Sequence, residues 1–246
     1  MSAPKGAASL SVLQLPSPNV VRGDTMRDSL GVAAPLSVVA YDGNDAKISD
    51  IKPLFFISDT SHTAHLKDGA VLVGDRLGFV QLIGQVGGLQ TPPVSVPVTV
   101  APTTFARVLN TDPTKGDTLF APPSTDSAAS IGRVALAVSL RGVGDTASQG
   151  FVVRYKLLQD PAPPATKPGA TTPAVYLATD PAHIASIDTT DATGATLLLV
   201  VNAFYLANQK PLDSAVVEVS TSYKGVPVAG SPIRIVVPIK VTFTVK

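Results

Sequence analysis

Every second residue is Val in the stretch Val94-Ser95-Val96-Pro97-Val98-Thr99-Val100. Successive side chains of a β-strand point to opposite faces, so this spacing predicts a strand with one face in a core. Similar alternation recurs in the segments 134–140, 151–157 and 217–223. In the second of these, Arg154 and Lys156 fall on the face opposite the apolar residues. These segments predict antiparallel sheets with one buried face and one face in water.

The composition favours the same fold class. The chain of 246 residues contains 22 Pro and 19 Gly, which are spread along its whole length. Such frequent turn residues leave few windows for a helix of three turns, whereas the β-branched residues between them suit strands. The sequence therefore predicts an all-β protein.

A weak internal repeat divides the chain into two parts. Arg22-Gly23-Asp24-Thr25 is echoed by Lys115-Gly116-Asp117-Thr118, and each follows a Val-Leu pair and a Pro-containing segment. A period of about 93 residues matches the size of one β-sandwich domain. We expect one sandwich over residues 1–101 and a second, with longer loops and an extended C-terminal strand, over residues 102–246.

The first domain resembles the bacterial immunoglobulin-like domains of group 2. The resemblance rests on Gly23-Asp24-Thr25 after an opening strand, the turn Asp42-Gly43-Asn44, and the segment Phe55-Phe56-Ile57. That family usually carries a Trp near Phe55, and this chain has no Trp.

The second domain resembles the invasin-like group at residues 189–197, and residues 223–232 are similar to the last hairpin of filamin-type repeats. These resemblances imply two tandem immunoglobulin-like antiparallel β-sandwich domains. They imply no particular function, because sandwiches of this kind host many unrelated roles.

Charge and composition exclude several classes of partner. Lys and Arg number 19 against 18 Asp and Glu, and no basic run concentrates the positive charge that nucleic acid or an anionic membrane surface would attract. The absence of Cys excludes disulfides and thiolate metal sites. The most apolar window, residues 195–207, is shorter than the roughly 20 residues that cross a bilayer. We expect no transmembrane segment, no nucleic-acid partner, no small-molecule substrate and no cofactor.

The N-terminal residues predict no secretory signal, because no apolar segment follows a positive start. The expected location is therefore a particle or the periphery of a membrane complex. If a signal preceded Met1 and was removed, the extracellular surface is the expectation instead.

Two motifs suggest specific recognition or metal binding. Arg22-Gly23-Asp24 is the tripeptide that integrins read in adhesive proteins, although a Gly-Asp pair also suits a turn of the fold at this point. His62 and His65 form the closest histidine pair, but residues three apart on an extended segment point to opposite faces. We therefore favour a turn for the first motif and loop or edge histidines for the second.

Acidic loops raise the possibility of calcium, which takes six to eight oxygen ligands. The best candidates are Asp188 and Asp191, but turns capped by their own side chains explain such residues equally well. We expect no metal site and keep these two residues as weak calcium candidates.

Nothing in the sequence predicts an enzyme. There is no Gly-x-Ser-x-Gly motif for a nucleophilic Ser, and Glu218 is the single Glu of the chain. We expect no catalytic residues.

The last predicted strand is unusually long. From Ile233 to Val245 every odd residue is apolar, and these thirteen residues would span roughly 43 Å against a usual strand of five or six residues. Pro238 could break the run so that the rest folds back, the rest could open a third domain, or it could pair with the sheet edge of another protein. The last alternative gives four predicted partner-binding residues: Ile239, Val241, Phe243 and Val245.

The sequence favours a non-enzymatic structural or accessory protein, a rigid tandem module that docks onto other protein subunits of a larger assembly. A virion protein and a peripheral subunit of a membrane complex both fit. The alternative is a fragment of a bacterial cell-surface adhesin. A glycan-binding module, which stacks sugars on exposed rings, is disfavoured because aromatic residues make up only 5% of the chain. Four of them are expected in the cores: Phe55, Phe56, Tyr155 and Tyr223.

Overall fold

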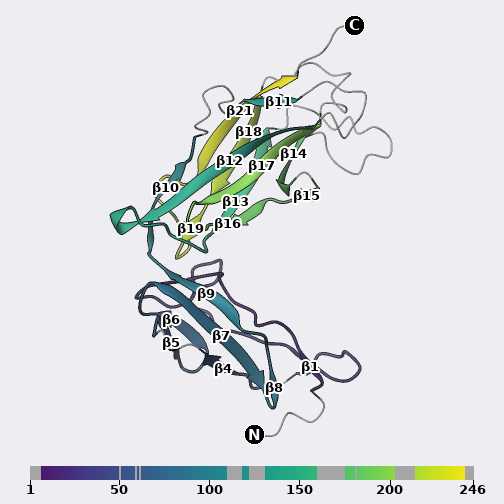
Figure 1. Ribbon diagram of the computed structural model, residues 1–246, viewed down its shortest axis with the longest axis vertical. Helices are drawn as coiled ribbons and strands as arrows, with labels where there is room; N and C mark the ends of the chain where they lie inside the picture. Colours follow the sequence, from purple (N-terminus) through teal and green to yellow (C-terminus); the bar gives the residue numbers. More distant parts are fainter. Residues whose placement is uncertain are drawn as a thin grey trace. The chain divides into compact units, whose positions relative to one another are not determined.

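The computed structural model confirms an all-β fold of immunoglobulin-like sandwich type (Figure 1). It describes residues 7–49, 51–58, 60, 62–109, 118–121, 131–159, 175–180, 182–202 and 214–241. The one helical element among them is a 3-10 turn, η1 (Val143–Asp145). In the described part of the chain, no helix is long and apolar enough to cross a membrane.

The chain forms two compact units, and each is assembled from three stretches of sequence. Unit 1 consists of Met1–Pro102, Gly142–Phe151 and Tyr223–Val226. Unit 2 consists of Thr103–Arg141, Val152–Ser222 and Pro227–Lys246. The sequence pattern suggested one division near residue 101 and gave no sign that two later segments pack into unit 1.

Unit 1 is built around one five-stranded sheet and two small two-stranded ones. The large sheet has the order β2 (Val20–Val21), β9 (Val94–Thr99), β7 (Gly78–Val86) and β4 (Leu54–Ile57), and β8 (Leu89–Gln90) also pairs with β7. The small sheets are β1 (Ser9–Leu10) with β3 (Ala40–Tyr41), and β5 (Ala64–Lys67) with β6 (Val71–Gly74). The β2–β9 pair is parallel, whereas the other pairs named are antiparallel.

The core of unit 1 follows the alternation in the sequence. Val96 and Val98 of β9 are buried against Val80 and Leu82 of β7. On β4, Phe55 is buried as expected, but the expectation for Phe56 is wrong because its side chain is 43% exposed. Adjacent residues of a strand face opposite sides, so only one of the two rings can enter the core.

Unit 2 is a sandwich of two five-stranded sheets. The first has the order β10 (Pro102–Arg107), β12 (Ile131–Gly142), β17 (Ala195–Asn202), β14 (Val175–Asp180) and β15 (His183–Ile184). The second has the order β11 (Leu119–Ala121), β21 (Ile233–Val241), β18 (Ser214–Ser220), β13 (Val152–Gln159) and β16 (Ile187–Thr189). A separate hairpin pairs β19 (Ser222–Tyr223) with β20 (Val226–Pro227), and its residues Tyr223–Val226 belong to unit 1.

The strands of unit 2 confirm the predicted faces. On β13, Val153 and Tyr155 are buried, whereas Arg154 and Lys156 are exposed. Strand β14 departs from simple alternation, since residues 175–178 are all buried. Tyr176, Ala178 and Val200 form a second, smaller apolar cluster. Both faces of the sheet are therefore covered at β14 and β17.

The last strand continues through Pro238, so the interpretation that this proline breaks it is wrong. Strand β21 pairs with β18 up to the Ser214–Pro238 position, and its parallel pairing with β11 begins at Ile239. Pro238 therefore lies where the pairing with β18 ends and the pairing with β11 begins. A proline is tolerated there, because its missing N–H group removes few hydrogen bonds between the strands. Each unit thus has a short early strand parallel to its last long strand, β2 with β9 and β11 with β21.

Candidate functional site around Asp24

The Arg-Gly-Asp sequence forms a tight turn at the end of β2, which confirms the turn interpretation. Gly23 adopts a φ of 76°, and the Asp24 N–H donates a hydrogen bond of 3.0 Å to the Val21 carbonyl. Two further bonds join the turn to Gly74, from the Gly23 N–H (2.7 Å) and to the Asp24 carbonyl (3.0 Å). A positive φ at this position favours Gly, because other residues are strained there.

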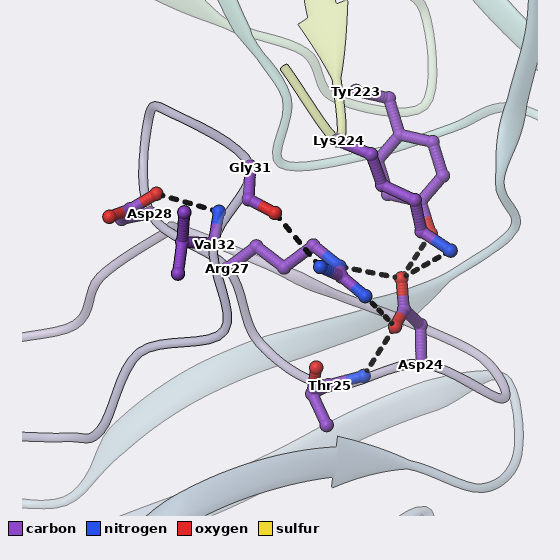
Figure 2. Close-up of polar contacts among 8 residues, drawn as sticks. All are labelled: Asp24, Thr25, Arg27, Asp28, Gly31, Val32, Tyr223 and Lys224. Carbon is purple, nitrogen blue, oxygen red and sulfur yellow. Dashed lines mark hydrogen bonds and ion pairs between the residues drawn. The ribbon is translucent and has the colours of Figure 1, made fainter. Parts of the chain in front are cut away.

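The Asp24 carboxylate is the centre of a polar cluster, shown in Figure 2. Arg27 donates to both oxygens, from Nη2 to Oδ1 at 2.8 Å and from Nε to Oδ2 at 3.0 Å. The Tyr223 hydroxyl donates to Oδ2 at 2.6 Å, and Lys224 Nζ lies 3.1 Å from the same oxygen. The Thr25 N–H completes the set with a bond of 2.8 Å to Oδ1. We call Asp24, Arg27, Tyr223 and Lys224 the Asp24 cluster.

A neighbouring loop is held by the same arginine. Arg27 Nη1 donates to the Gly31 carbonyl at 2.8 Å, and Asp28 Oδ1 accepts from the Val32 N–H at 2.9 Å (Figure 2). The same Asp28 oxygen also accepts from the Leu30 N–H at 2.9 Å. Gly31 has a φ of 82°, and a Cβ atom there would lie 2.2 Å from the Lys224 carbonyl carbon. The loop therefore contacts the backbone of the Tyr223–Val226 segment directly, which only a residue without a side chain allows.

The electrostatics of the cluster follow from this geometry. The Asp24 side chain is only 12% exposed, and this burial alone would raise its pKa. Hydrogen bonds from Arg27, Tyr223 and Lys224 outweigh that effect and hold the pKa of Asp24 well below its usual range. Burial first, and then the bond to the Asp24 carboxylate, raise the pKa of the Tyr223 hydroxyl above its usual value. The carboxylate is thus ionised and the phenol neutral at ordinary pH.

The arrangement leaves the Asp24 carboxylate little capacity for an external ligand. An integrin would have to reach a carboxylate that is mostly buried and already binds three side chains of its own chain. The Asp24 carboxylate instead binds groups of its own chain, and its bond to Tyr223 joins two segments that lie 199 positions apart in the sequence.

The lowered pKa of Asp24 predicts how unit 1 responds to acid. A carboxylate with a lowered folded-state pKa adds stability that is complete above its unfolded pKa, about 3.9, and is lost as the pH falls through the folded pKa. The free energy that Asp24 contributes should be constant between about pH 5 and 8 and shrink below about pH 4. Urea denaturation of wild type and Asp24→Asn at several pH values measures this contribution as the gap between the two curves. A gap that keeps its size down to about pH 2.5 would contradict the assignment.

The histidines lie apart from this cluster and form two exposed His–Asp pairs. His65 Nδ1 is 2.8 Å from Asp75 Oδ2, and His183 Nδ1 is 2.7 Å from Asp180 Oδ2. His62 lies in an irregular segment with a φ of 52°. Among the described residues, no three His, Asp or Glu side chains gather as metal ligands would.

The two calcium candidates both accept hydrogen bonds from nearby backbone groups, Asp188 on strand β16 and Asp191 in the turn before β17. Asp188 accepts the N–H groups of Thr189 (2.8 Å) and Thr196 (2.7 Å) on separate oxygens. Asp191 Oδ1 accepts the Thr193 N–H, the Thr193 hydroxyl and the Gly194 N–H. Asp191 thus caps a turn with its own side chain, as the sequence allowed, whereas Asp188 joins strand β16 to the start of β17.

The predicted partner-binding residues divide into two groups. Ile239 is 5% exposed and packs in the core of unit 2, so its side chain is not on a free surface. The Val241 backbone pairs with Ala121 of β11. Phe243 and Val245 lie outside the described residues, and their role stays a prediction.

Sequence reasoning missed the partners of Asp24. Tyr223 was expected in a core, but it is only half-buried: its ring packs edge-to-face on Phe151 with centroids 5.9 Å apart, and its hydroxyl donates to a carboxylate. A second remote contact was missed too: Asn19 Nδ2 donates to the Gln149 carbonyl at 2.8 Å, and the Gln149 N–H donates to Thr99 Oγ1 at 2.9 Å. Neither contact leaves a trace in local patterning, because the partners are far apart in sequence.

No family model matches the chain, and no curated protein sequence matches it. Among solved structures, domains 4 and 5 of the S-layer protein SbsC align over 97% of this chain and 100% of that one, with 10% identity and a TM-score of 0.33. The Yersinia pseudotuberculosis adhesin InvE aligns over 97% of this chain and 61% of its own, with 14% identity and a TM-score of 0.35. The Escherichia coli adhesin FdeC aligns over 94% and 65%, with 13% identity and a TM-score of 0.29.

This chain therefore spans less than two thirds of the InvE and FdeC chains that it matches. Similarity at these identities and scores says nothing about function, and the fold is established by the sheets themselves.

Proposed function

We propose that this chain is a non-enzymatic structural or accessory protein that docks onto other proteins of a larger assembly. A virion protein or a peripheral subunit of a membrane complex would have this role. The observation that carries the proposal is the exposure of large apolar side chains on regular sheet faces in both units. Exposed apolar side chains gathered on one face of a protein mark sites where another protein binds.

The outer face of the large sheet of unit 1 supports this role. Phe79 of β7 is 58% exposed and lies opposite Pro97 of β9, while the exposed Phe56 of β4 lies opposite Ile83. Phe79 and Ile83 are four residues apart on β7 and so point to the same side. The pairs Phe79–Pro97 and Phe56–Ile83 therefore place apolar side chains on one outer face, on either side of the polar pair Gln81–Ser95.

The use of charge supports a structural role as well. The Asp24 carboxylate binds three side chains of its own unit, and the described histidines His65 and His183 pair with exposed Asp residues near them. The most strongly perturbed carboxylate of the described residues thus has a function in holding unit 1 together.

Size measurement in the native source tests the proposal. The chain should be recovered under mild conditions in a particle much larger than its own 25.2 kDa, with the same partner proteins in each preparation. Recovery at its own mass would contradict the proposal. Labelling of the chain on intact cells by a membrane-impermeant reagent, without a stable partner, would favour the cell-surface adhesin instead.

A further inference from the structure

The second sheet of unit 2 has an outer face that is rich in cations. Strands β13, β18 and β21 are neighbours in this sheet (Figure 1), and their outward residues alternate with buried ones. The charged residues of this face are Arg154 and Lys156 on β13, Glu218 on β18, and Arg234 and Lys240 on β21. We call these five residues the basic face.

The register shows that the charges share one side of the sheet. Lys156 lies directly opposite Glu218, which in turn lies directly opposite Arg234. Their chain neighbours Tyr155 and Ile235 are buried in the core, so the charged side chains point the other way.

The basic face carries an excess of positive charge, whereas cations and carboxylates nearly balance over the whole chain. Four cations and one carboxylate give this face a net charge of +3, whereas the entire chain carries +1. Glu218 is half-buried between two cations, and its Oε2 lies 3.7 Å from Arg234 Nε. Glu218 therefore orients Arg234 but leaves most of the positive charge uncompensated within the face.

Apolar side chains lie among these cations. Val236 of β21 is 54% exposed, and the ring of Phe120 on β11 is 47% exposed, with Lys240 Nζ 5.9 Å from its centroid. Pro238, between Val236 and Lys240, is exposed as well. Protein interfaces combine an apolar centre with charged and polar residues around it, and Arg is enriched in them.

We propose that the basic face binds an acidic surface of a partner protein. This inference rests on the proposed docking function and names the surface and the charge of the partner. A protein fits better than a single-stranded nucleic acid, because among the described residues of this face Phe120 is the one exposed ring, whereas stacking of successive bases needs several. Charge complementarity of this kind sets orientation and association rate.

Zero-length crosslinking of the complex from its native source tests the proposal. A carbodiimide joins a lysine amine to a carboxylate that touches it, so Lys156 and Lys240 should be joined to Asp or Glu of the partner. The exposed lysines Lys47, Lys52 and Lys67 of unit 1 are the internal controls and should give few such products. Partner crosslinks only at the controls would overturn the inference while leaving the docking function intact. Absence of any partner would overturn both.

A charge-reversed variant gives a second, independent result. Lys156→Glu with Arg234→Glu should lower the affinity of the full chain for the partner at least about tenfold, most strongly at low salt. The matched control Lys47→Glu with Lys52→Glu changes the net charge equally and should stay within about twofold. Equal affinity of the two variants would contradict the proposal. Displacement of the partner by a single-stranded oligothymidylate, where polyglutamate fails, would assign the face to nucleic acid instead.

Discussion

A Gly31→Ala variant is expected to lose about 3 kcal/mol or more of the free energy of unfolding of unit 1. Two costs add up. The residue has a φ of 82°, where an L-residue pays roughly 1–2 kcal/mol. Its new Cβ would also lie 2.2 Å from the Lys224 carbonyl carbon and 2.3 Å from the Gly225 nitrogen, so one backbone must move. That shift would also disturb the bond between Arg27 and the Gly31 carbonyl.

Gly23→Ala is the matched control for this substitution. Gly23 has a similar φ of 76°, but no atom lies within 4 Å of the place its Cβ would take. The Gly23→Ala variant should therefore lose only about 1 kcal/mol of the free energy of unfolding of unit 1, which is the conformational cost alone. Hydrogen exchange of β7 and β9 peptides in rising urea measures the stability of unit 1 in both variants. Equal losses would show that the close contact at Gly31 has no energetic weight.

Asp24→Asn is expected to cost unit 1 about 2–3 kcal/mol at pH 7. The amide keeps the size of the side chain but removes the charge that Arg27 and Lys224 neutralise, and it leaves mostly buried donors with a weaker acceptor. Lys224 is 48% exposed, so its share is small, and most of the loss should come from Arg27 and Tyr223.

Asp42→Asn is the control for loss of an aspartate charge in a turn. Asp42 also accepts hydrogen bonds from two backbone N–H groups, those of Asn44 and Ala46, but it lies in an exposed turn. Its replacement by Asn should therefore lower the free energy of unfolding by less than about 0.5 kcal/mol. A double-mutant cycle of Asp24→Asn with Tyr223→Phe should give a coupling of about 1 kcal/mol or more. Additive losses would mean that the hydroxyl and the carboxylate do not interact.

Periodicity and turn chemistry predicted the local structure well. The alternating Val residues of 94–100 and the two faces of β13 follow directly from the two-residue repeat of a strand. Gly23 marks a turn that needs a positive φ. These features depend on neighbours in sequence, which is why the sequence reveals them.

Features that depend on remote packing could not be predicted. The bond from Tyr223 to Asp24 joins residues 199 positions apart. A Tyr among apolar neighbours in the sequence predicts a core position whether or not its hydroxyl has a hydrogen-bond partner. The same limit explains Phe56, since a pair of adjacent rings does not say which one faces inward. It also explains Pro238, whose position between two ladders is set by where β18 and β11 pair.

The carboxylate of the Arg-Gly-Asp sequence is engaged within unit 1 and is not displayed to a receptor. The ¹³C chemical shift of the Asp24 carboxyl carbon, followed by NMR as the pH falls from 7 to 3 and assigned with the Asp24→Asn variant, tests this most directly. We expect a flat shift over this range, because Arg27, Tyr223 and Lys224 keep the carboxylate ionised with a pKa far below the usual value. A titration with a midpoint near the ordinary Asp value of about 3.9 would contradict it.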